Sequence, residues 1–461
     1  MRLLHLSDIH FRSPICLTPH LDRTKPFRSR LEHDLAELCE ADGIRVDAIL
    51  VGGDIAFKAD PDEYKAAKAW LLRIAEICGC RTPNIFTVPG NHDVDRATCA
   101  KDAVTQAQAG IADQANNSAR DQALMRRLAT EEEAKSLFEP LEAYNNFAAQ
   151  FGCQIFHTHP CWERTLELGQ GVKLRLHGLT STLISGAGDR DSAPGRLFLG
   201  ACQVVLDPDP DVVSLVLCHH PPSWFLDASD AENIIDARAK LQFFGHEHDQ
   251  RCKRVNEYMR FLAGAVNTER DEPAWRPGYN LVDLTVVGDG ASRELDVRAR
   301  LRAFQPAPAE FYVALHSSPR EPLWLHRLSI PAPIRPTFAA VPGPHLAEEM
   351  LPHPPQQETK MSAAVQATID GSLGEGGPAL LQTVQSPEYK VSEPSTDDLV
   401  FRFWQLRVDV MRDIAMGLEL ITEADLDLPP HRRYFKALEV AKQKGLIVEL
   451  AREIEKHEQN V

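Results

Sequence analysis

Short apolar runs alternate with longer polar stretches over the first three hundred residues of the chain. Runs of this kind, rich in β-branched residues and bounded by Gly, Pro and Asp, predict buried strands, and the amphipathic stretches between them predict helices. Helices are expected notably at 28–41 and 63–78. The alternation is typical of an α/β layered domain. The expected strands are 2–6, 47–51, 84–88, 172–176, 212–218, 241–244, 259–263 and 279–286.

The segment 97–151 has a different pattern. It is rich in Ala, Gln, Arg and Glu and poor in β-branched residues, which predicts a helical insertion. Two interpretations stay open, because the helices could cap a site beside Asn91 or merely cover a face of a sheet.

Prolines recur after residue 304, which predicts a change of organisation there. The segment 305–330 still contains strand-like runs and could extend the first domain, 1–304. Residues 331–394 are expected to form a Pro/Gly-rich linker.

The segment 395–461 is predicted to form a separate small all-α domain. Ser395 with Asp398 resembles the start of a helix, and helices are also expected at 431–444 and 446–456. The segment carries no cluster of potential ligands, so an interaction role is more plausible than a catalytic one. The apolar face of its first helix comprises Leu399, Phe403, Leu406, Val410 and Ile414.

Length and charge narrow the possible functions. A chain of 461 residues is expected to form two or more folded units. A net charge of −16 disfavours broad adhesion to nucleic acid, although metals and a local basic groove can compensate, so a nuclease is not excluded. The N-terminus lacks a signal-peptide pattern, and no apolar run reaches the roughly 18 residues of a membrane helix. No membrane partner and a cytoplasmic location are therefore expected.

Polar residues follow five of the expected strands at the point where each strand ends. One such cluster, Gly90-Asn91-His92-Asp93, would by itself be read as an ordinary turn. Five clusters together are different, because the carboxyl ends of parallel strands converge on one crevice. The other four clusters are 7–10 (SDIH), 52–54 (GGD), 218–222 (CHHPP) and 245–248 (GHEH).

The donor atoms in these clusters exceed what one four-coordinate ion requires. They match two ions that share one carboxylate. Mixed imidazole and carboxylate ligands suit Mn, Fe, Zn, Co or Ni better than Ca or Mg, and the sequence does not choose among the five. The donors are two carboxylates, one amide and four imidazoles: Asp8, Asp54, Asn91, His10, His219, His246 and His248.

The ordered motifs D-x-H, G-D, G-N-H-D, H and G-H-x-H resemble those of the calcineurin-like metallophosphoesterase superfamily. Within it, LSDIHF, GNHD and LCHHPP are most similar to the cyclic-nucleotide phosphodiesterase branch. The resemblance covers roughly residues 1–300 and implies a layered β-sandwich flanked by helices.

The resemblance also implies roles for single residues. Asp8, His10 and His248 would hold one metal, and Asp54 would bridge to the second. The ligands of the second metal would be Asn91, His219 and His246. His220 is then expected to contact a ligand or the substrate.

His92 resembles the non-ligand histidine of the family, which contacts the phosphate or protonates the leaving oxygen. Asp93 would fix the tautomer and orientation of His92. Both are therefore candidate catalytic residues.

These roles imply a dinuclear metal-dependent phosphodiesterase in which metal-bound hydroxide attacks phosphorus. A cyclic nucleotide or other small phosphodiester is the favoured substrate, and a nuclease acting on DNA or RNA is the alternative. A scaffold that has lost catalysis is a third possibility, which the intact ligand set disfavours. The terminal helices, particularly 418–450, resemble death-like effector-associated domains of bacterial conflict systems, which implies a protein partner bound through 395–461.

Some residues near these motifs have less certain roles. His157 and His159 imitate the spacing of the last ligand pair without a preceding Gly, and contact with the site is not expected. Trp224 is expected to pack its own loop. Arg12 could meet a substrate phosphate or remain on the surface, and both interpretations stay open.

Overall fold

The computed structural model describes residues 1–18, 20–186, 196–267, 276–314 and 323–331 and, near the end of the chain, 403, 406, 408–422, 425 and 430–458. The chain forms two compact units, Met1–Leu346 and Ala347–Val461. Apart from Pro331, the predicted linker 331–394 lies outside the described residues, and so does the predicted helix start at 395–398.

The first sheet has the strand order β12-β11-β10-β1-β2-β3, with β13 also paired to β11. β1, β2 and β3 are parallel, so their carboxyl ends lie at the same edge of the sheet, whereas β10 runs antiparallel to β1. The strands are β1 (Arg2–Leu6), β2 (Ala48–Val51), β3 (Ile85–Thr87), β10 (Gly278–Val287), β11 (Glu294–Pro306), β12 (Ala309–Val313) and β13 (Trp324–Ser329).

The second sheet has the order β4-β5-β6-β7-β9-β8. Its four central strands are parallel, and β4 and β8 are antiparallel edge strands. The carboxyl ends of β6 and β7 therefore lie side by side. The strands are β4 (Trp162–Gly169), β5 (Val172–Gly178), β6 (Val212–Cys218), β7 (Leu241–Phe244), β8 (Arg251–Arg254) and β9 (Met259–Leu262).

The two sheets share one hydrophobic core. Leu4 of β1 and Ile49 of β2 belong to the same buried cluster as Leu215 of β6 and Phe243 of β7. Each of these side chains is fully buried. The shared core identifies a two-layer β-sandwich.

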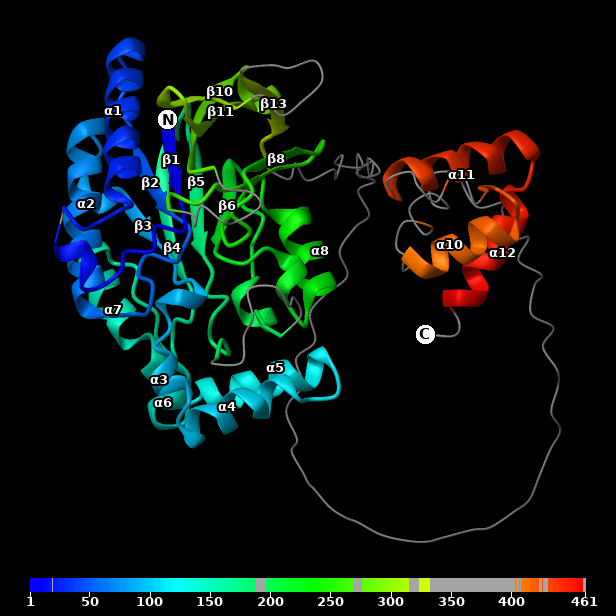
Figure 1. The fold of residues 1–461 in the computed structure, drawn as a ribbon, viewed down its shortest axis with the longest axis horizontal. Helices are drawn as coiled ribbons and strands as arrows, with labels where there is room; N and C mark the ends of the chain where they lie inside the picture. The colour runs from blue at the N-terminus through cyan, green and yellow to red at the C-terminus, as the bar shows by residue number, and fades with distance from the viewer. Residues whose placement is uncertain are drawn as a thin grey trace, which may run out of the picture. The chain divides into compact units, whose positions relative to one another are not determined.

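Helices flank the sandwich. Figure 1 shows α1 (Lys25–Asp42) and α2 (Pro61–Cys78) beside the β1–β2–β3 part of the first sheet, and α8 (Ala228–Arg238) beside the second sheet. α2 begins with a capping box between Asp60 and Glu63. The predicted fold class, a layered α/β sandwich flanked by helices, is confirmed.

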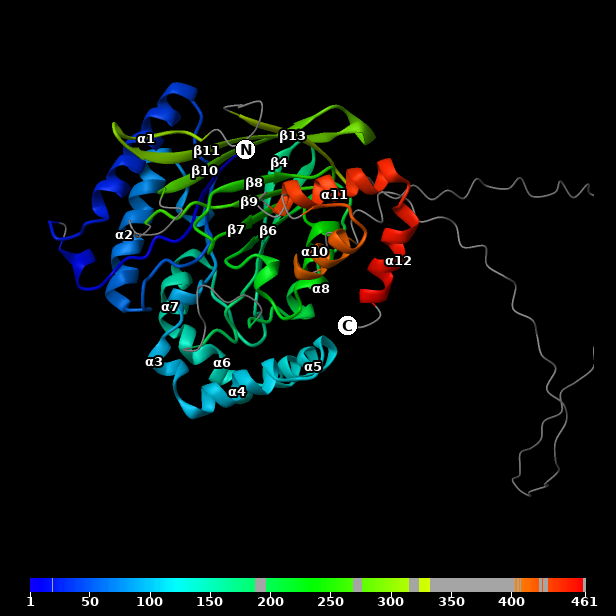
Figure 2. The same cartoon turned by 45° about the vertical axis from the view of Figure 1, so that its right-hand side comes forward.

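The segment 97–151 is helical, as predicted. In two views α4, α5 and α6 lie at the opposite end of this unit from β10, β11 and β13 (Figures 1 and 2). Gln108 of α4 donates a 2.8 Å hydrogen bond to Ser185 O, in the loop after β5. The helices are α3 (Arg96–Cys99), α4 (Asp102–Ala112), α5 (Asn117–Leu128), α6 (Glu131–Phe138) and α7 (Glu142–Ala148).

Short 3₁₀ turns connect several elements of this unit. They are η1 (Ile15–Leu17), η2 (Thr82–Asn84), η3 (Asn91–Asp93), η4 (Glu139–Leu141), η5 (Ala149–Phe151), η6 (Ala201–Gln203), η7 (Pro222–Trp224) and η8 (Gly290–Ser292).

The second unit contains α10 (Val408–Gly417), α11 (Pro430–Lys444) and α12 (Ile447–Glu458), so C-terminal helices are present as predicted. They pack around an apolar core of their own that includes Phe403 and Ile414. Among the helices described, none has the length and apolar character needed to cross a membrane.

Candidate metal centre

The carboxyl ends of β1, β2, β3, β6 and β7 bring the predicted ligands together. Sets of three histidine or aspartate side chains have one ligand atom each within 4.8 Å of one another. These sets are Asp8–His10–His248, Asp8–Asp54–His219, His10–Asp54–His92 and His219–His220–His246.

The first set corresponds to the first predicted metal. His248 Nε2 lies 3.2 Å from Asp8 Oδ1, and His10 Nε2 lies 4.0 Å from the same oxygen. His10 Nε2 is also 3.9 Å from Asp54 Oδ2. The side chain of His248 is 22% exposed, so this half of the centre is open to solvent.

The second half is closed. His219 Nε2 lies 3.2 Å from Asn91 Oδ1 and 3.4 Å from Asp54 Oδ2. His219 and Asn91 are buried, and His246 lies in the same group of imidazoles. Asp54 therefore contacts ligands of both predicted metals.

The hydrogen bond of His219 to the backbone determines which ring nitrogen faces the carboxylate. Its Nδ1 lies 2.7 Å from Gly52 O, which can only accept, so Nδ1 carries the proton. In the neutral ring, Nε2 then presents its lone pair to the oxygens of Asp54 and Asn91. Electron-rich atoms facing one another in this way require a proton or a cation between them.

His220 also contacts Asn91. Its Nε2 lies 3.1 Å from Asn91 Oδ1, and its Nδ1 lies 2.8 Å from Ser181 Oγ. The sequence pattern favours His219 over His220 as a ligand and does not single out Ser181. A usable signal was present, because Ser181 follows the predicted strand 172–176 and so occupies a sixth strand end.

His92 is oriented by a backbone carbonyl. Its Nδ1 lies 2.8 Å from Phe57 O, its ring stacks on the Phe57 ring with 5.0 Å between centroids, and its backbone N–H donates to Asp54 Oδ1. The expectation that Asp93 fixes the His92 tautomer is therefore wrong.

Asp93 instead holds two strand-end loops together. Its carboxylate accepts hydrogen bonds from the backbone N–H groups of Ile55, Ala56 and Gly90 and from the Tyr64 hydroxyl. Burial, followed by the nearby Asp54, raises the pKa of Asp93 to about 6, although the backbone donors oppose this shift. Sequence proximity to His92 gave no indication of these long-range partners.

The backbone is strained at the ligands. Nine described non-glycine residues have a positive φ, and five of them are predicted ligands. Left-handed backbone is unfavourable for residues with a Cβ and clusters at functional sites. The five ligands are Asp8, His10, Asp54, His246 and His248.

Glycine permits the close approach of the loops. A Cβ on Gly90 would lie 2.1 Å from Asp54 Oδ1, and one on Gly53, where φ is +95°, would lie 2.6 Å from His219 Nδ1. A side chain at either position would displace a predicted ligand.

The pKa values show how strongly the buried carboxylates attract positive charge. Burial tends to raise the pKa of Asp54, but the neighbouring His219 lowers it well below its usual range. Burial tends to lower the pKa of His219, yet Asp54 and Asp8 raise it to about 9. Without a metal, His219 thus takes up the positive charge that these carboxylates require.

The remaining donors also suit a metal. Burial lowers the pKa of His10 to about 4 and of His246 to about 3, which keeps both rings neutral and able to donate a lone pair. His246 Nε2 is buried and has no hydrogen-bond partner among the described residues. These residues therefore fit divalent transition-metal ions.

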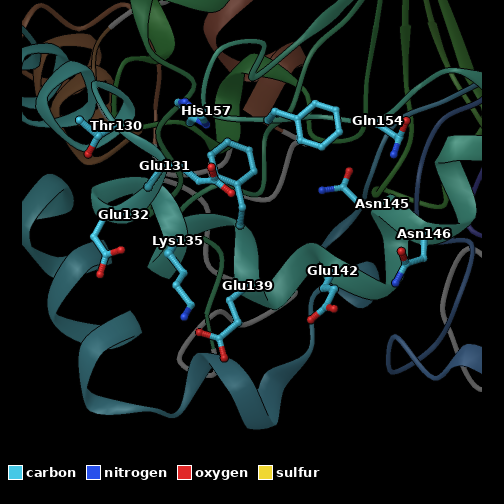
Figure 3. A pocket seen from close by; sticks show the side chains of 13 residues that line it. Thr130, Glu131, Glu132, Lys135, Glu139, Glu142, Asn145, Asn146, Gln154 and His157 are labelled. Carbon is cyan, nitrogen blue, oxygen red and sulfur yellow. The ribbon is translucent and has the colours of Figure 1, made fainter.

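Trp224 lies beside the predicted ligands, whereas His157 lies away from them. The Trp224 ring is 4.1 Å from the His246 ring, so it packs against a predicted ligand. His157 lines a separate cavity of about 850 Å³ beside α6 and α7 (Figure 3). The described lining of that cavity includes none of the predicted ligands. This cavity is therefore separate from the predicted metal centre.

Residues 1–250 match the family described as calcineurin-like phosphoesterase, and residues 395–456 match the GTPase-associated adaptor domain. No curated protein matches the chain.

Solved structures resemble the chain only remotely. Vps29 from Chaetomium thermophilum has 9% identity and a TM-score of 0.29, with 72% of this chain and 100% of that one covered. Vps29 from Entamoeba histolytica, in complex with zinc, has 11% identity and a TM-score of 0.28, with 71% of this chain and 98% of that one covered. A putative 5'-nucleotidase from Staphylococcus aureus has 12% identity and a TM-score of 0.29, with 71% of this chain and 54% of that one covered.

Proposed function

The chain belongs to the calcineurin-like phosphoesterase family, and from this premise we propose that it is a phosphodiesterase dependent on two divalent transition-metal ions. The position of Asp54 carries the proposal. Its Oδ2 atom lies 3.4 Å from His219 Nε2 and 3.9 Å from His10 Nε2, which supports a carboxylate shared between two ions.

The ligands divide into two sets around Asp54. Asp8, His10 and His248 would hold one ion, and Asn91 would join the imidazoles at the other. Those imidazoles are His219 and His246, with His220 as a further donor. Such ions, when bound, lower the pKa of a water molecule and neutralise charge on the phosphoryl oxygens.

His92 supplies the proton for the leaving oxygen. Because Nδ1 faces Phe57 O, the proton available for transfer is the one that Nε2 carries in the imidazolium form. The Phe57 carbonyl, by accepting from Nδ1, leaves Nε2 as the ring nitrogen that can exchange a proton with the substrate. His92 is also only partly buried, so a substrate can reach it.

The substrate is proposed to be a cyclic nucleotide or another small phosphodiester. A nuclease is the second candidate, and one observation favours it: Arg12, Arg23 and Arg28 line a cavity that includes His10. Arginine side chains beside the ligands suit a substrate with several phosphates.

Hydrolysis by metal-stripped protein reconstituted with Mn²⁺ tests the proposal. The substrates are cyclic AMP, cyclic GMP, single- and double-stranded DNA and RNA, with Asp54→Ala as the blank. Turnover of cyclic nucleotides alone supports the first candidate, and cutting of polymers supports the second. Failure of the purified protein to bind any transition metal would favour a scaffold that has lost catalysis.

We also propose that the C-terminal helices bind a protein partner, because residues 395–456 match an adaptor domain. Deletion of 395–461 should abolish capture of that partner and spare turnover of a soluble substrate. Loss of both would contradict a separate adaptor role.

A further inference from the structure

Glu63, on the first turn of α2, is a fully buried carboxylate that the proposed reaction does not use. Both of its oxygens accept hydrogen bonds from the backbone. Oε1 accepts from the N–H of Ser13 at 2.9 Å, and Oε2 accepts from those of Phe57, Lys58 and Asp60 at 3.1, 3.0 and 3.2 Å. These donors compensate for the cost of burying the carboxylate.

Helix capping alone does not account for these contacts. A glutamate at this position of a capping box bonds to the N–H of the cap residue, which is Asp60 here. The bonds to Ser13, Phe57 and Lys58 lie outside that motif. Glu63 therefore ties the start of α2 to two separate loops.

The two loops follow β1 and β2, after the predicted ligands at the ends of those strands. They are also joined directly, because the N–H of Phe57 is shared between Phe11 O and Glu63 Oε2, at 3.1 Å from each. The Glu63 carboxylate thus holds the junction of the two loops at Phe57.

Phe57 is the residue that orients His92. Its carbonyl accepts from His92 Nδ1 at 2.8 Å, and its ring stacks on the imidazole with 23° between the planes. The carbonyl of Phe57 and the N–H of Lys58 belong to one planar peptide group and point in opposite directions. Glu63 holds the N–H end of this group at 3.0 Å, which fixes the direction of the carbonyl end.

The same contact strengthens the carbonyl as an acceptor. A carboxylate at the N–H end polarises the peptide group, and hydrogen bonds arranged in a chain reinforce one another. The chain here runs from Glu63 through the peptide group of Phe57 and Lys58 to His92.

From these contacts we propose that Glu63 is a positioning residue for His92. By holding the peptide group between Phe57 and Lys58, it selects the neutral tautomer with the proton on Nδ1, which is the form left after Nε2 has given its proton to the leaving oxygen. The catalytic consequence rests on the proposed phosphodiesterase function, whereas the choice of tautomer does not depend on turnover. Among the described hydrogen bonds of Glu63, none goes to a predicted ligand.

Nitrogen-15 chemical shifts of the imidazole test the tautomer in metal-stripped protein labelled at histidine. The His92 signals are identified by their absence from His92→Ala, at a pH at which free imidazole is neutral. The wild type should show Nδ1 protonated. Glu63→Gln replaces one acceptor oxygen by an NH₂ group that faces backbone donors, so its His92 signals should move towards a mixture of the two tautomers.

Dependence on the leaving group tests the catalytic consequence in the Mn²⁺-loaded protein. The p-nitrophenyl and ethyl esters of thymidine 5'-phosphate are both diesters, but p-nitrophenolate leaves without a proton and an alkoxide requires one. Glu63→Gln should lower kcat for the ethyl ester roughly tenfold or more, since general acid catalysis contributes at least that much. The p-nitrophenyl ester should lose far less.

A double variant tests whether Glu63 acts through His92. Two residues that act through one proton transfer have effects that do not add. In the His92→Ala background, Glu63→Gln should therefore leave kcat for the ethyl ester near the value of His92→Ala alone. A further fall as large as that in the wild-type background would overturn the proposal.

Two control variants separate positioning from stability and from ring stacking. Asp34→Asn removes another buried carboxylate, one that bonds to Arg302 and Tyr279, and should lower the unfolding midpoint without changing the His92 tautomer or the ratio of the two esters. Phe57→Leu removes the stacked ring but keeps the carbonyl, and should retain the tautomer. Loss of the tautomer in either control but not in Glu63→Gln would overturn the proposal.

The two measurements distinguish failure of this inference from failure of the proposed function. If the loaded protein cleaves neither ester but Glu63→Gln shifts the tautomer, the phosphodiesterase function is wrong and the positioning role stands. If Glu63→Gln does not fold, Glu63→Asp, which keeps the charge and shortens the reach, should shift the tautomer in its place. An unchanged tautomer with equal losses for both esters would overturn the positioning role and leave Glu63 a role in the fold alone.

Discussion

The strand-end cluster and the core of the C-terminal helices are both buried, but by opposite kinds of residue. The core of the helices consists of apolar side chains such as Phe403, Ile414 and Leu450. The strand-end cluster buries Asp8, Asp54 and several imidazoles, at positions with strained backbone.

The residues of the helical core are those that apolar packing requires, whereas the residues of the strand-end cluster are those that metal binding requires. Burying charged groups costs free energy unless they are paired or bind a metal. Local rules of stability are broken mainly at functional sites. The strand-end cluster should therefore depend on metal ions, whereas the helical core should be indifferent to them.

The largest effect is expected from Asp54→Ala. Removal of the shared carboxylate should lower kcat/KM by about a thousandfold or more, because the charge stabilisation provided by both ions depends on it. Hydrolysis assays and metal analysis measure the loss. Asp62→Ala, at an exposed position on α2, is the control and should behave as wild type. Full activity in Asp54→Ala would contradict the expected dependence of the strand-end cluster on metal ions.

Gly90→Ala should have the next largest effect. The added Cβ would lie 2.1 Å from Asp54 Oδ1, so the loops must separate, at a cost of about 1–3 kcal/mol in unfolding free energy. The affinity for metal ions should fall together with the stability of the fold. Gly110→Ala in α4 is the control, because its Cβ would meet only Arg127, at 4.0 Å. Equal denaturation midpoints for the two variants would contradict the close approach described above.

Ser181→Ala should have a smaller effect, restricted to one ion. Ser181 Oγ holds His220 Nδ1, and loss of such an outer partner weakens metal binding roughly tenfold to a hundredfold. Metal titration should show one weakened ion and one unchanged, with Ser223→Ala, exposed in η7, as the control. Weakening of both ions alike would argue against separate halves of the centre.

The smallest effect is expected in the stability of the C-terminal helical unit as the pH falls. Lys436 and Thr422 lower the pKa of Asp425 from 3.8 to about 2 by hydrogen bonding. The ionised carboxylate thus stabilises the folded unit above pH 3.8, and this contribution is lost as the pH falls through 2.

Amide hydrogen exchange in α11 measures that contribution. Protection should decline between about pH 4 and pH 2, and the decline should be smaller in Asp425→Asn, whereas Asp413→Asn should follow the wild type. A decline that depends on added metal would contradict the contrast between the two regions.

Most strands of the sandwich were predictable because they are short apolar runs. β1, β6 and β7 begin and end where the apolar pattern does. β4 was missed because it is a largely exposed edge strand that carries Glu163, Arg164 and Glu167. β11 was missed although LDVRARLRA alternates apolar and polar residues, since its Arg content obscured the pattern.

The ligand positions were predictable for a similar reason, since each follows a recognisable strand. The contacts that orient them were not. Phe57 acts on His92 through its backbone carbonyl, which no side-chain pattern reveals, and Asp93 finds its partners in the loop after β2. Ser13 is held by the carboxylate of Glu63, fifty residues away in the sequence.

Metal stoichiometry distinguishes the proposed two-ion centre from a centre with one ion or none. The protein is stripped of metal, reconstituted with Mn²⁺, freed of unbound ions and analysed for metal per chain and for hydrolysis of a chromogenic phosphodiester. Two ions per chain are expected in the wild type, with hydrolysis appearing only on reconstitution. A single ion per chain at saturation, or equal hydrolysis by the metal-stripped protein, would contradict it.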